Sequence, residues 1–237
     1  MDTCDQKVEE EEEEFKLVLF IDKKINKIFE SCGLMKVEIL SLNENEIKFS
    51  VDGLNQSLAS ALRRVMLSEV PTMAIEWVDF KKNDSALNDE IIAHRLGLVP
   101  LTFDKKVYNL PSECSCNGKG CSRCQVKLTL KKKGPCTVYA EDLKSTDKDV
   151  KPVYPKIPIV ELLEDQELQL EATAQLGIGR EHAKWQAAVV GYEISDGKFI
   201  FTVESVCGLK PEEVVISAIE VLEKKFKEFG KLVKKIK

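Results

Sequence analysis

The sequence contains no long hydrophobic run. The chain has 237 residues and is 43% hydrophobic, which is enough apolar material for one substantial core or two modest ones. No apolar segment approaches the roughly 20 residues that a membrane-spanning helix requires. The longest early segment, Leu17 to Ile21, follows an acidic run, whereas a signal peptide begins with positive charge. We therefore expect a cytosolic protein with no membrane partner.

The sequence also lacks an excess of basic residues. Its formal net charge is -5, and this charge is unevenly placed. Residues 1–34 hold ten acidic and five basic side chains, so the remainder of the chain, with thirty of each, is neutral. DNA phosphates require a basic face. We therefore expect no tight, direct binding to DNA, although a local basic patch stays open.

Groups for catalysis are scarce as well. The chain has two histidines, His94 and His182, and each stands next to a charged residue. A catalytic histidine needs a nucleophile or a metal within reach, and the sequence suggests neither. There is no phosphate-binding glycine loop and no acidic triad for magnesium. We predict structural hydrogen bonds for both histidines and no catalytic residue.

Hydrophobic periodicity predicts an α+β fold. Period-two alternation and turn residues predict strands at residues 36–40, 46–51, 74–80, 126–131, 137–140, 167–176, 185–194 and 198–206. Helical patterns end before Pro71, before Gly97 and at the C-terminus, which predicts helices at residues 55–69, 88–96 and from Pro211 onward.

These elements suggest two domains. Residues 35–80 and 165–237 form one discontinuous domain with an antiparallel sheet, helices and a long C-terminal helix. Residues 81–164 are rich in Cys, Gly, Pro and Lys, and we expect them to form an inserted, mostly-β domain. Residues 1–34 are an acidic N-terminal extension, in which Glu9–Glu14 is typical of a solvated, disordered tail. Met35 could be an alternative start.

The C-terminal helix carries a heptad pattern. Its apolar residues are spaced alternately by four and three: Val215, Ile219, Leu222, Phe226, Phe229, Val233 and Ile236. This seam could pack on its own domain, but its length and regularity favour the helix of a partner chain. Seven lysines between Lys224 and Lys237 suit a helix C-terminus and cover a solvated face.

The helix expected at residues 55–69 combines an apolar stripe with two arginines. The stripe consists of Leu58, Leu62, Val65 and Met66. Arg63 and Arg64 stand side by side in the middle of the helix, and small residues at positions 57, 59, 60 and 61 allow another element to approach closely. On these grounds alone, a surface helix with two solvated arginines is the favoured interpretation.

Four of the eight cysteines have metal-ligand spacing. Cys114-x-Cys116 and Cys121-x2-Cys124 flank a turn that contains Gly118 and Gly120. Tetrahedral zinc takes four such thiolates at about 2.3 Å, and a site filled by four protein ligands is structural. We predict structural zinc; an iron–sulfur cluster is the rival, although the spacing is not that of the bacterial ferredoxin run. Free thiols in a loop that has lost its metal are the third possibility.

The other cysteines are scattered along the chain. Cys4, Cys32, Cys136 and Cys207 show no such spacing, and we expect plain thiols, with Cys136 as the candidate exception because it lies near the loop. Nothing in the sequence points to secretion, so a disulfide framework is not expected.

Three segments, in the same order along the chain, resemble the RNA polymerase α family. The first is LNQSLASALRRVMLSEVP at residues 54–71, followed by the strand AIEWV at 74–78. The second is EIIAHRLGLVPL at residues 90–101, and the third is GIGREHAKWQ at residues 177–186. The family includes the bacterial α subunit, the third-largest subunit of eukaryotic polymerase II and the archaeal D-type subunit. The short chain, without a bacterial-style C-terminal DNA-binding domain, favours the archaeal type.

The resemblance implies a non-catalytic assembly subunit of DNA-directed RNA polymerase. The discontinuous domain would dimerise with a smaller α-like subunit of the archaeal L type through the heptad seam and the apolar stripe. Two sets of residues would dock the large catalytic subunits: Arg63 and Arg64, and the loop residues Arg180, Glu181, His182 and Lys184. Arginine suits this role because its planar fork pairs with partner carboxylates. Small subunits of the N and P type would be further partners.

Some archaeal relatives carry an additional ferredoxin-like domain, but the hairpin between Trp185 and Val206 leaves no room for it here. Two other functions stay open: a stand-alone zinc-binding nucleic-acid-binding protein, and an iron–sulfur electron carrier.

Overall fold

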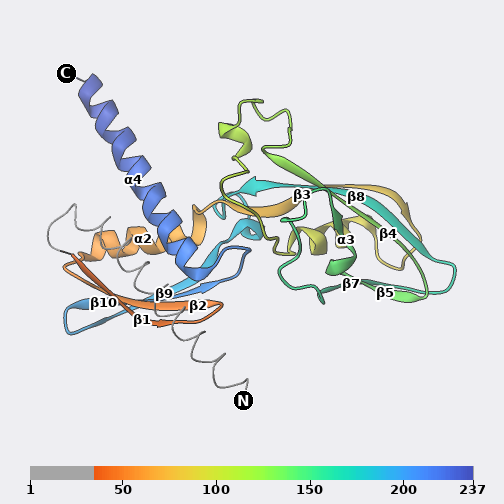
Figure 1. The fold of residues 1–237 in the computed structure, drawn as a ribbon, viewed down its shortest axis with the longest axis horizontal. Helices are drawn as coiled ribbons and strands as arrows, with labels where there is room; N and C mark the ends of the chain where they lie inside the picture. Colours follow the sequence, from red (N-terminus) through yellow and green to blue (C-terminus); the bar gives the residue numbers. More distant parts are fainter. Residues whose placement is uncertain (1–34, 237) are drawn as a thin grey trace, which may run out of the picture. The chain divides into compact units, whose positions relative to one another are not determined.

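The computed structural model describes residues 35–236, which form two compact units (Figure 1). Unit 1 comprises residues 35–67, 188–205 and 210–236, and unit 2 comprises residues 68–187 and 206–209. The expected α+β class with antiparallel sheets is confirmed. The expected acidic extension lies outside the described residues. No helix within residues 35–236 combines the length and the apolar composition that crossing a membrane requires.

The boundaries between the units differ from the expected ones. We expected them near residues 80 and 165, which would leave β3 (Thr72–Asn83) and β8 (Glu167–Gly177) in the discontinuous domain. Instead, β8 is hydrogen-bonded between β3 and β4 (Gln125–Lys133), so both strands belong to unit 2. The assignment of β3 and β8 to unit 2 depends on strand partners that are far apart in the sequence. Local composition cannot predict these partners.

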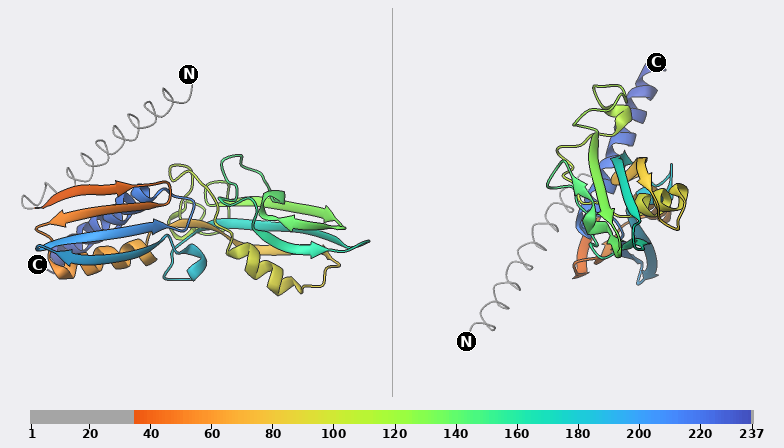
Figure 2. Two further views of the ribbon diagram at one scale, coloured as in Figure 1. Left: turned by 90° about the horizontal axis from the view of Figure 1, so that it is seen from below. Right: turned by 90° about the vertical axis from the view of Figure 1, so that its right-hand side faces the viewer.

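Unit 1 is a four-stranded sheet with both of its helices on one face (Figures 1 and 2). The strand order is β1 (Lys36–Leu42), β2 (Glu46–Asp52), β10 (Lys198–Ser205) and β9 (Ala188–Ser195). Alternate residues of these strands are buried, as period-two patterning requires: Val37, Ile47, Phe49, Val51, Phe199, Phe201 and Val203. The rings of Phe49 and Phe201 stack at 5.2 Å between their centroids, so adjacent strands share one core.

Helix α2 (Gln56–Ser68) begins at a side-chain cap. The Asn55 carboxamide oxygen accepts a hydrogen bond from the Leu58 N–H at 2.8 Å, which satisfies a backbone donor at the start of the helix. Leu62, Val65 and Met66 are 2%, 4% and 0% exposed. This placement changes our expectation for the apolar stripe: these three side chains pack inside the chain and have no surface left for a partner. Leu58 is half-buried and keeps some exposed surface.

Helix α4 (Pro211–Lys235) divides into two halves. The Glu213 carboxylate accepts a hydrogen bond from the Lys210 N–H at 2.9 Å, and Pro211 suits the first turn, so the helix begins where expected. The first half contacts β2 and β10 and buries Val215 and Ile219 in unit 1. The second half of the helix extends beyond the sheet, and its side chains from Glu223 to Phe229 are exposed (Figure 1).

Unit 2 is built on two antiparallel sheets. The larger has the order β3-β8-β4-β6, with β6 at Lys144–Ser145, and the smaller pairs β5 (Cys136–Tyr139) with β7 (Pro158–Leu162). Helix α3 (Asp89–Gly97) contacts β3 and β7. Short 3-10 helices lie at η1 (Pro111–Glu113), η2 (Ala140–Asp142) and η3 (Ala183–Trp185). Because η3 includes Trp185, the strand expected from residue 185 begins only at Ala188.

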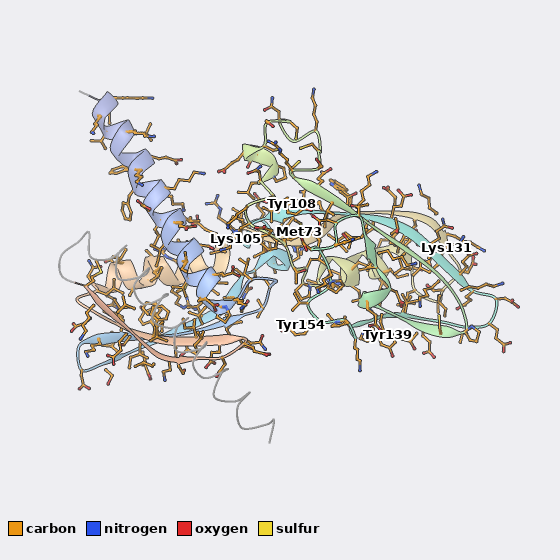
Figure 3. The ribbon with its side chains drawn as sticks, viewed as in Figure 1. Met73, Lys105, Tyr108, Lys131, Tyr139 and Tyr154 are labelled. Carbon is orange, nitrogen blue, oxygen red and sulfur yellow. The ribbon has the colours of Figure 1, made fainter. Side chains whose placement is uncertain are left out.

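Tyr108 joins the unit 2 core, near Met73 (Figure 3). Its hydroxyl donates to the Asp147 carboxylate at 2.5 Å. This hydrogen bond, together with one from the Asp149 N–H, holds the pKa of Asp147 below its usual value. The carboxylate therefore contributes stability above its unfolded-state pKa and loses it as the pH falls through the folded-state pKa.

We expect Tyr108→Phe to lower the free energy of unfolding by about 1 kcal/mol at pH 7. The difference from the parent chain should shrink in acid, where Asp147 is protonated in both. Denaturant titrations at pH 7 and in acid test this. A deficit that does not depend on pH would mean that the hydroxyl acts through packing rather than through the carboxylate.

Candidate metal centre and docking surfaces

The predicted cysteine ligands gather in the loop between η1 and β4. Gly118 and Gly120 turn the chain with φ angles of 77° and 86°, which glycine adopts without steric cost. The turn brings two pairs of thiols together. The Sγ atoms of Cys114 and Cys121 are 3.5 Å apart, those of Cys116 and Cys124 are 3.5 Å apart, and those of Cys121 and Cys124 are 3.7 Å apart.

This arrangement fits a tetrahedral metal ion. An ion bound by four thiolates at about 2.3 Å separates its sulfurs by roughly 3.8 Å. All four sulfurs lie within 4.8 Å of one another, and the Cys121 N–H also points at the Cys124 sulfur, at 3.3 Å. The four cysteines could therefore hold a metal ion. Because protein atoms fill every position of such a tetrahedron, the ion would tie the loop together rather than react.

The ionisation of the thiols supports a bound cation. Burial acts to raise the pKa of Cys116, but hydrogen bonds from Cys114 and Cys124 outweigh it and lower this pKa to about 6. Burial and the neighbouring thiols raise the pKa of Cys124 to about 12. The neighbouring thiols thus favour a negative charge on Cys116 and a proton on Cys124. A bound metal ion would remove this difference, because coordinated thiols are deprotonated outright.

Lys184 ties the loop after β8 to the sheet. Its ammonium group pairs with the Glu76 carboxylate, donates to the Ile75 carbonyl at 3.1 Å and lies 4.4 Å from the centroid of the Trp185 ring. Its side chain is only 13% exposed. We expected Lys184 to contact a large subunit. The structure turns its charge inward instead, so it positions the loop and offers little contact surface of its own.

The rest of this loop faces outward. Arg180, Glu181 and His182 are exposed, and the Arg180 N–H donates to the Ser68 carbonyl at 2.8 Å. The His182 Nδ1 atom accepts from the Lys184 N–H at 3.0 Å, which is a structural hydrogen bond of the kind we predicted. These three side chains thus form a held, polar surface.

The two histidines come together in a way that the sequence did not reveal. His94 of α3 and His182 line the same cavity of about 150 Å³. Glu76 and Leu98 contribute to its walls. No local pattern links residues so far apart in the sequence, because only the packing of α3 and the loop against β3 brings them together.

The arginine pair of α2 borders an open groove. The groove measures about 940 Å³ and lies between α2 and β9, where Gly191 and Tyr192 form part of its wall. The Arg63 Nε atom donates to the Val190 carbonyl at 2.9 Å, and Arg64 is exposed. Arg63 therefore already has one partner inside the chain, which the sequence did not suggest. Tyr192, whose hydroxyl lies 3.1 Å from that of Ser60, was also missed.

The second half of α4 presents apolar side chains to solvent. Phe226, Phe229, Val233 and Ile236 of the predicted seam are 64%, 66%, 45% and 86% exposed, and Leu232 beside them is 59% exposed. The seam therefore divides into two parts. Val215 and Ile219 pack the helix on its own sheet, and the residues from Phe226 to Ile236 form a solvent-exposed apolar face.

Together, the fold and these sites define a two-unit α+β protein that has a four-cysteine loop able to hold a metal ion, an exposed polar loop and an exposed apolar helix face. Residues 78–196, half of the chain, match the family described as RNA polymerase Rpb3/RpoA insert domain. The chain belongs to this family.

Several curated proteins named DNA-directed RNA polymerase subunit Rpo3 are similar to this chain. The protein of Methanothermobacter thermautotrophicus is 49% identical over 155 residues, which cover 64% of this chain and 58% of the relative. That of Methanosphaera stadtmanae is 47% identical over 165 residues, 67% of this chain and 61% of the relative. That of Pyrococcus furiosus is 48% identical over 159 residues, which cover 67% of this chain and 59% of the relative. The chain spans about three fifths of the length of these relatives.

Proposed function

We propose that this chain is a non-catalytic assembly subunit of an archaeal-type DNA-directed RNA polymerase and acts in transcription in the cytoplasm. Unit 1 dimerises with a smaller α-like subunit, and the pair forms the platform on which the large catalytic subunits assemble. Small subunits of the N and P type complete the set of partners. The single observation that carries the proposal is the exposed apolar face on the second half of α4, in a chain that belongs to a polymerase family.

The size of this apolar face argues for a partner helix. Burying a side chain such as Phe or Val contributes about 1.5–3 kcal/mol. Phe226, Phe229, Val233 and Ile236 therefore offer several kcal/mol that unit 1 leaves unused. Their heptad spacing is the spacing that a packed partner helix requires. The alternative that the whole seam packs on its own domain accounts only for its first half.

The docking of the large subunits is supported by two polar surfaces. The exposed loop residues Arg180, Glu181 and His182 are held in place by Lys184. Arg64 is exposed at the groove beside β9. The loop backbone is held by hydrogen bonds from the Arg180 N–H to the Ser68 carbonyl and from the Glu181 N–H to the Ile178 carbonyl. A loop that is already ordered loses less conformational entropy on binding, which suits it to a specific interface.

A pull-down with the tagged full chain tests the proposal. We expect a small α-like subunit and the two large polymerase subunits to copurify with it. A monomer without partners, in cells that make normal polymerase, would contradict the proposal. Salt-sensitive binding of the isolated chain to DNA would instead favour the nucleic-acid-binding alternative.

Arg64→Ala should weaken the larger assembly and spare the heterodimer. Arg64 is exposed on α2, so its loss should remove a charged contact with a large subunit and leave the core of unit 1 intact. We expect roughly a tenfold loss of affinity for the large subunits, the size typical of a charged interface contact. Arg63→Ala should also weaken binding to the large subunits. It should in addition lower the stability of unit 1, because the Val190 carbonyl loses its hydrogen bond from Arg63. Loss of the heterodimer in Arg64→Ala would show that the two faces are wrongly assigned.

Zinc is the metal that we propose for the cysteine loop, because four thiolates in a tetrahedron suit it best. We expect one zinc per chain by metal analysis of the purified protein. Cys114→Ser combined with Cys124→Ser should abolish this zinc, and the matched control Cys136→Ser should keep it, because Cys136 lies outside the cluster. A brown protein that contains iron would point to the iron–sulfur alternative instead.

A further inference from the structure

Strand β9 is an edge strand without the usual protection. Natural edge strands avoid pairing with other chains by bulges, lysines, prolines or short length. In the sheets of residues 35–236, β1 has a bulge at Leu40, β3 has two bulges, β6 has two residues, and the short β5–β7 pair has a bulge. By contrast, β9 pairs with β10 over eight residues in unbroken register and contains neither Lys nor Pro. Its single charge, Glu193, lies 3.7 Å from Lys48 of β2.

The hydrogen bonds of unit 1 show which peptide groups of β9 face outward. The Ser205 N–H donates to the Asn45 carbonyl at 2.8 Å, so it points away from β9. The even-numbered residues of β10 therefore direct their N–H and C=O groups toward β9. They form the hydrogen-bonded pairs of the ladder: 198 with 195, 200 with 193, 202 with 191 and 204 with 189. The peptide groups of Val190, Tyr192 and Ile194 then face the open side. The bond from Arg63 to the Val190 carbonyl agrees with this assignment.

The open side of β9 is a positively charged groove. Among residues 35–236, the side chains that line it come from Gln56, Ser57, Ser60, Arg63, Arg64 and Tyr192, and none of these is acidic. Gly191 also lines it, and an added Cβ there would meet nothing within 4 Å. Glycine inside a strand often marks the close approach of another backbone. Val189 and Ile194 on the same strand are 52% and 57% exposed, which gives an incoming strand apolar contacts.

We propose that β9 pairs with an extended acidic segment of a large polymerase subunit, which adds a fifth strand to the sheet of unit 1. This inference rests on the proposed function and deepens it. Main-chain hydrogen bonds to Tyr192 and Ile194 would supply the pairing. Carboxylates of the incoming segment would pair with Arg64 and with the part of the Arg63 guanidinium that the Val190 carbonyl leaves unused.

A second copy of this chain is the weaker occupant. Pairing of β9 with another β9 would bring two arginine pairs into one groove, and like charges facing each other oppose association. The positive lining thus selects an acidic strand.

Two substitutions at Ile194 separate strand pairing from side-chain contact. Ile194→Pro removes an outward N–H and leaves the pairing with β10 intact, because proline is tolerated on an edge strand when its nitrogen faces outward. Ile194→Thr is the matched control: it removes the same apolar side chain but keeps the N–H. The full chain, in its heterodimer, is titrated with the purified large catalytic subunits, and hydrogen exchange is followed at Tyr192 and Ile194.

We expect the large subunits to slow the exchange of both amides in the parent chain. Ile194→Pro should weaken binding by about tenfold, and Ile194→Thr by no more than about threefold. A complex that forms without protecting these amides, or that is equally sensitive to both substitutions, overturns the inference and leaves the proposed function standing. No complex at all would count against the proposed function itself. Self-association of the parent chain that Ile194→Pro abolishes would identify a second copy as the occupant and also overturn the inference.

Discussion

Replacing Phe226 and Phe229 with lysine should abolish the heterodimer while the chain stays folded. Both rings are about two thirds exposed on the second half of α4, so the core of unit 1 does not depend on them. Surface substitutions of this kind usually change stability by less than about 0.5 kcal/mol. In the partner interface, however, each lysine would replace a ring worth about 1.5–3 kcal/mol and place a charge in an apolar seam.

We therefore expect at least a thousandfold loss of affinity for the small α-like subunit, since roughly 4 kcal/mol corresponds to that factor. Analytical ultracentrifugation of the coexpressed pair measures it, and circular dichroism checks that the variant is folded. Lys231→Ala is the matched control, because Lys231 lies on the same exposed half of the helix but outside the seam. A heterodimer of unchanged affinity would place the interface elsewhere on unit 1.

Gly177→Ala should destabilise unit 2. A Cβ atom at Gly177, the last residue of β8, would lie 2.3 Å from the ring atoms of Trp185. The ring cannot easily move away. The Trp185 indole N–H donates to the Gln175 carbonyl at 3.3 Å, and the Trp185 carbonyl accepts from the Thr72 hydroxyl at 2.9 Å. We expect a loss of about 2–3 kcal/mol, the cost of overpacking a rigid site.

Denaturant titration followed by tryptophan fluorescence measures this loss. Gly191→Ala is the matched control, because it is also a glycine in a strand, but an added Cβ there meets nothing within 4 Å. We expect this control to unfold like the parent chain. If Gly177→Ala were equally stable, the contact between Gly177 and the Trp185 ring could relax, and Trp185 would not be a rigid support for the loop after β8. Where unit 2 is weakened, the binding of the large subunits should weaken too, and the heterodimer through α4 should remain.

Local patterns predicted most of the elements. The alternation of apolar and polar residues placed β1, β2, β4 and β8 within a few residues of their observed bounds, and Asn55 and Pro71 marked the ends of α2. These features depend on neighbours in the sequence, so they can be read without the fold. The exception is the start of β9. Trp185 continues an apolar pattern, but its indole N–H bonds to β8, its carbonyl accepts a hydrogen bond from Thr72 of β3, and its backbone forms η3 instead.

The candidate sites divide in the same way. The cysteine cluster was predictable because Cys114, Cys116, Cys121 and Cys124 lie within eleven residues, with glycines where the chain must turn. The geometry of the residues that we propose for docking was predicted only in part. The inward direction of Lys184 depends on Glu76, and the bond of Arg63 depends on Val190, and both partners are remote in the sequence.

The heptad seam shows the division within a single helix. Its spacing alone determined that one face of α4 is apolar from Val215 to Ile236, because helical periodicity is a property of the sequence. Only the tertiary structure decided which part of that face is buried: Val215 and Ile219 are buried in unit 1, whereas Phe226 is exposed. The same holds for the strands. The sequence by itself determined that β3, β8 and β9 are strands, and the pairing of backbones far apart along the chain decided that β3 and β8 are covered by neighbours while β9 remains an edge.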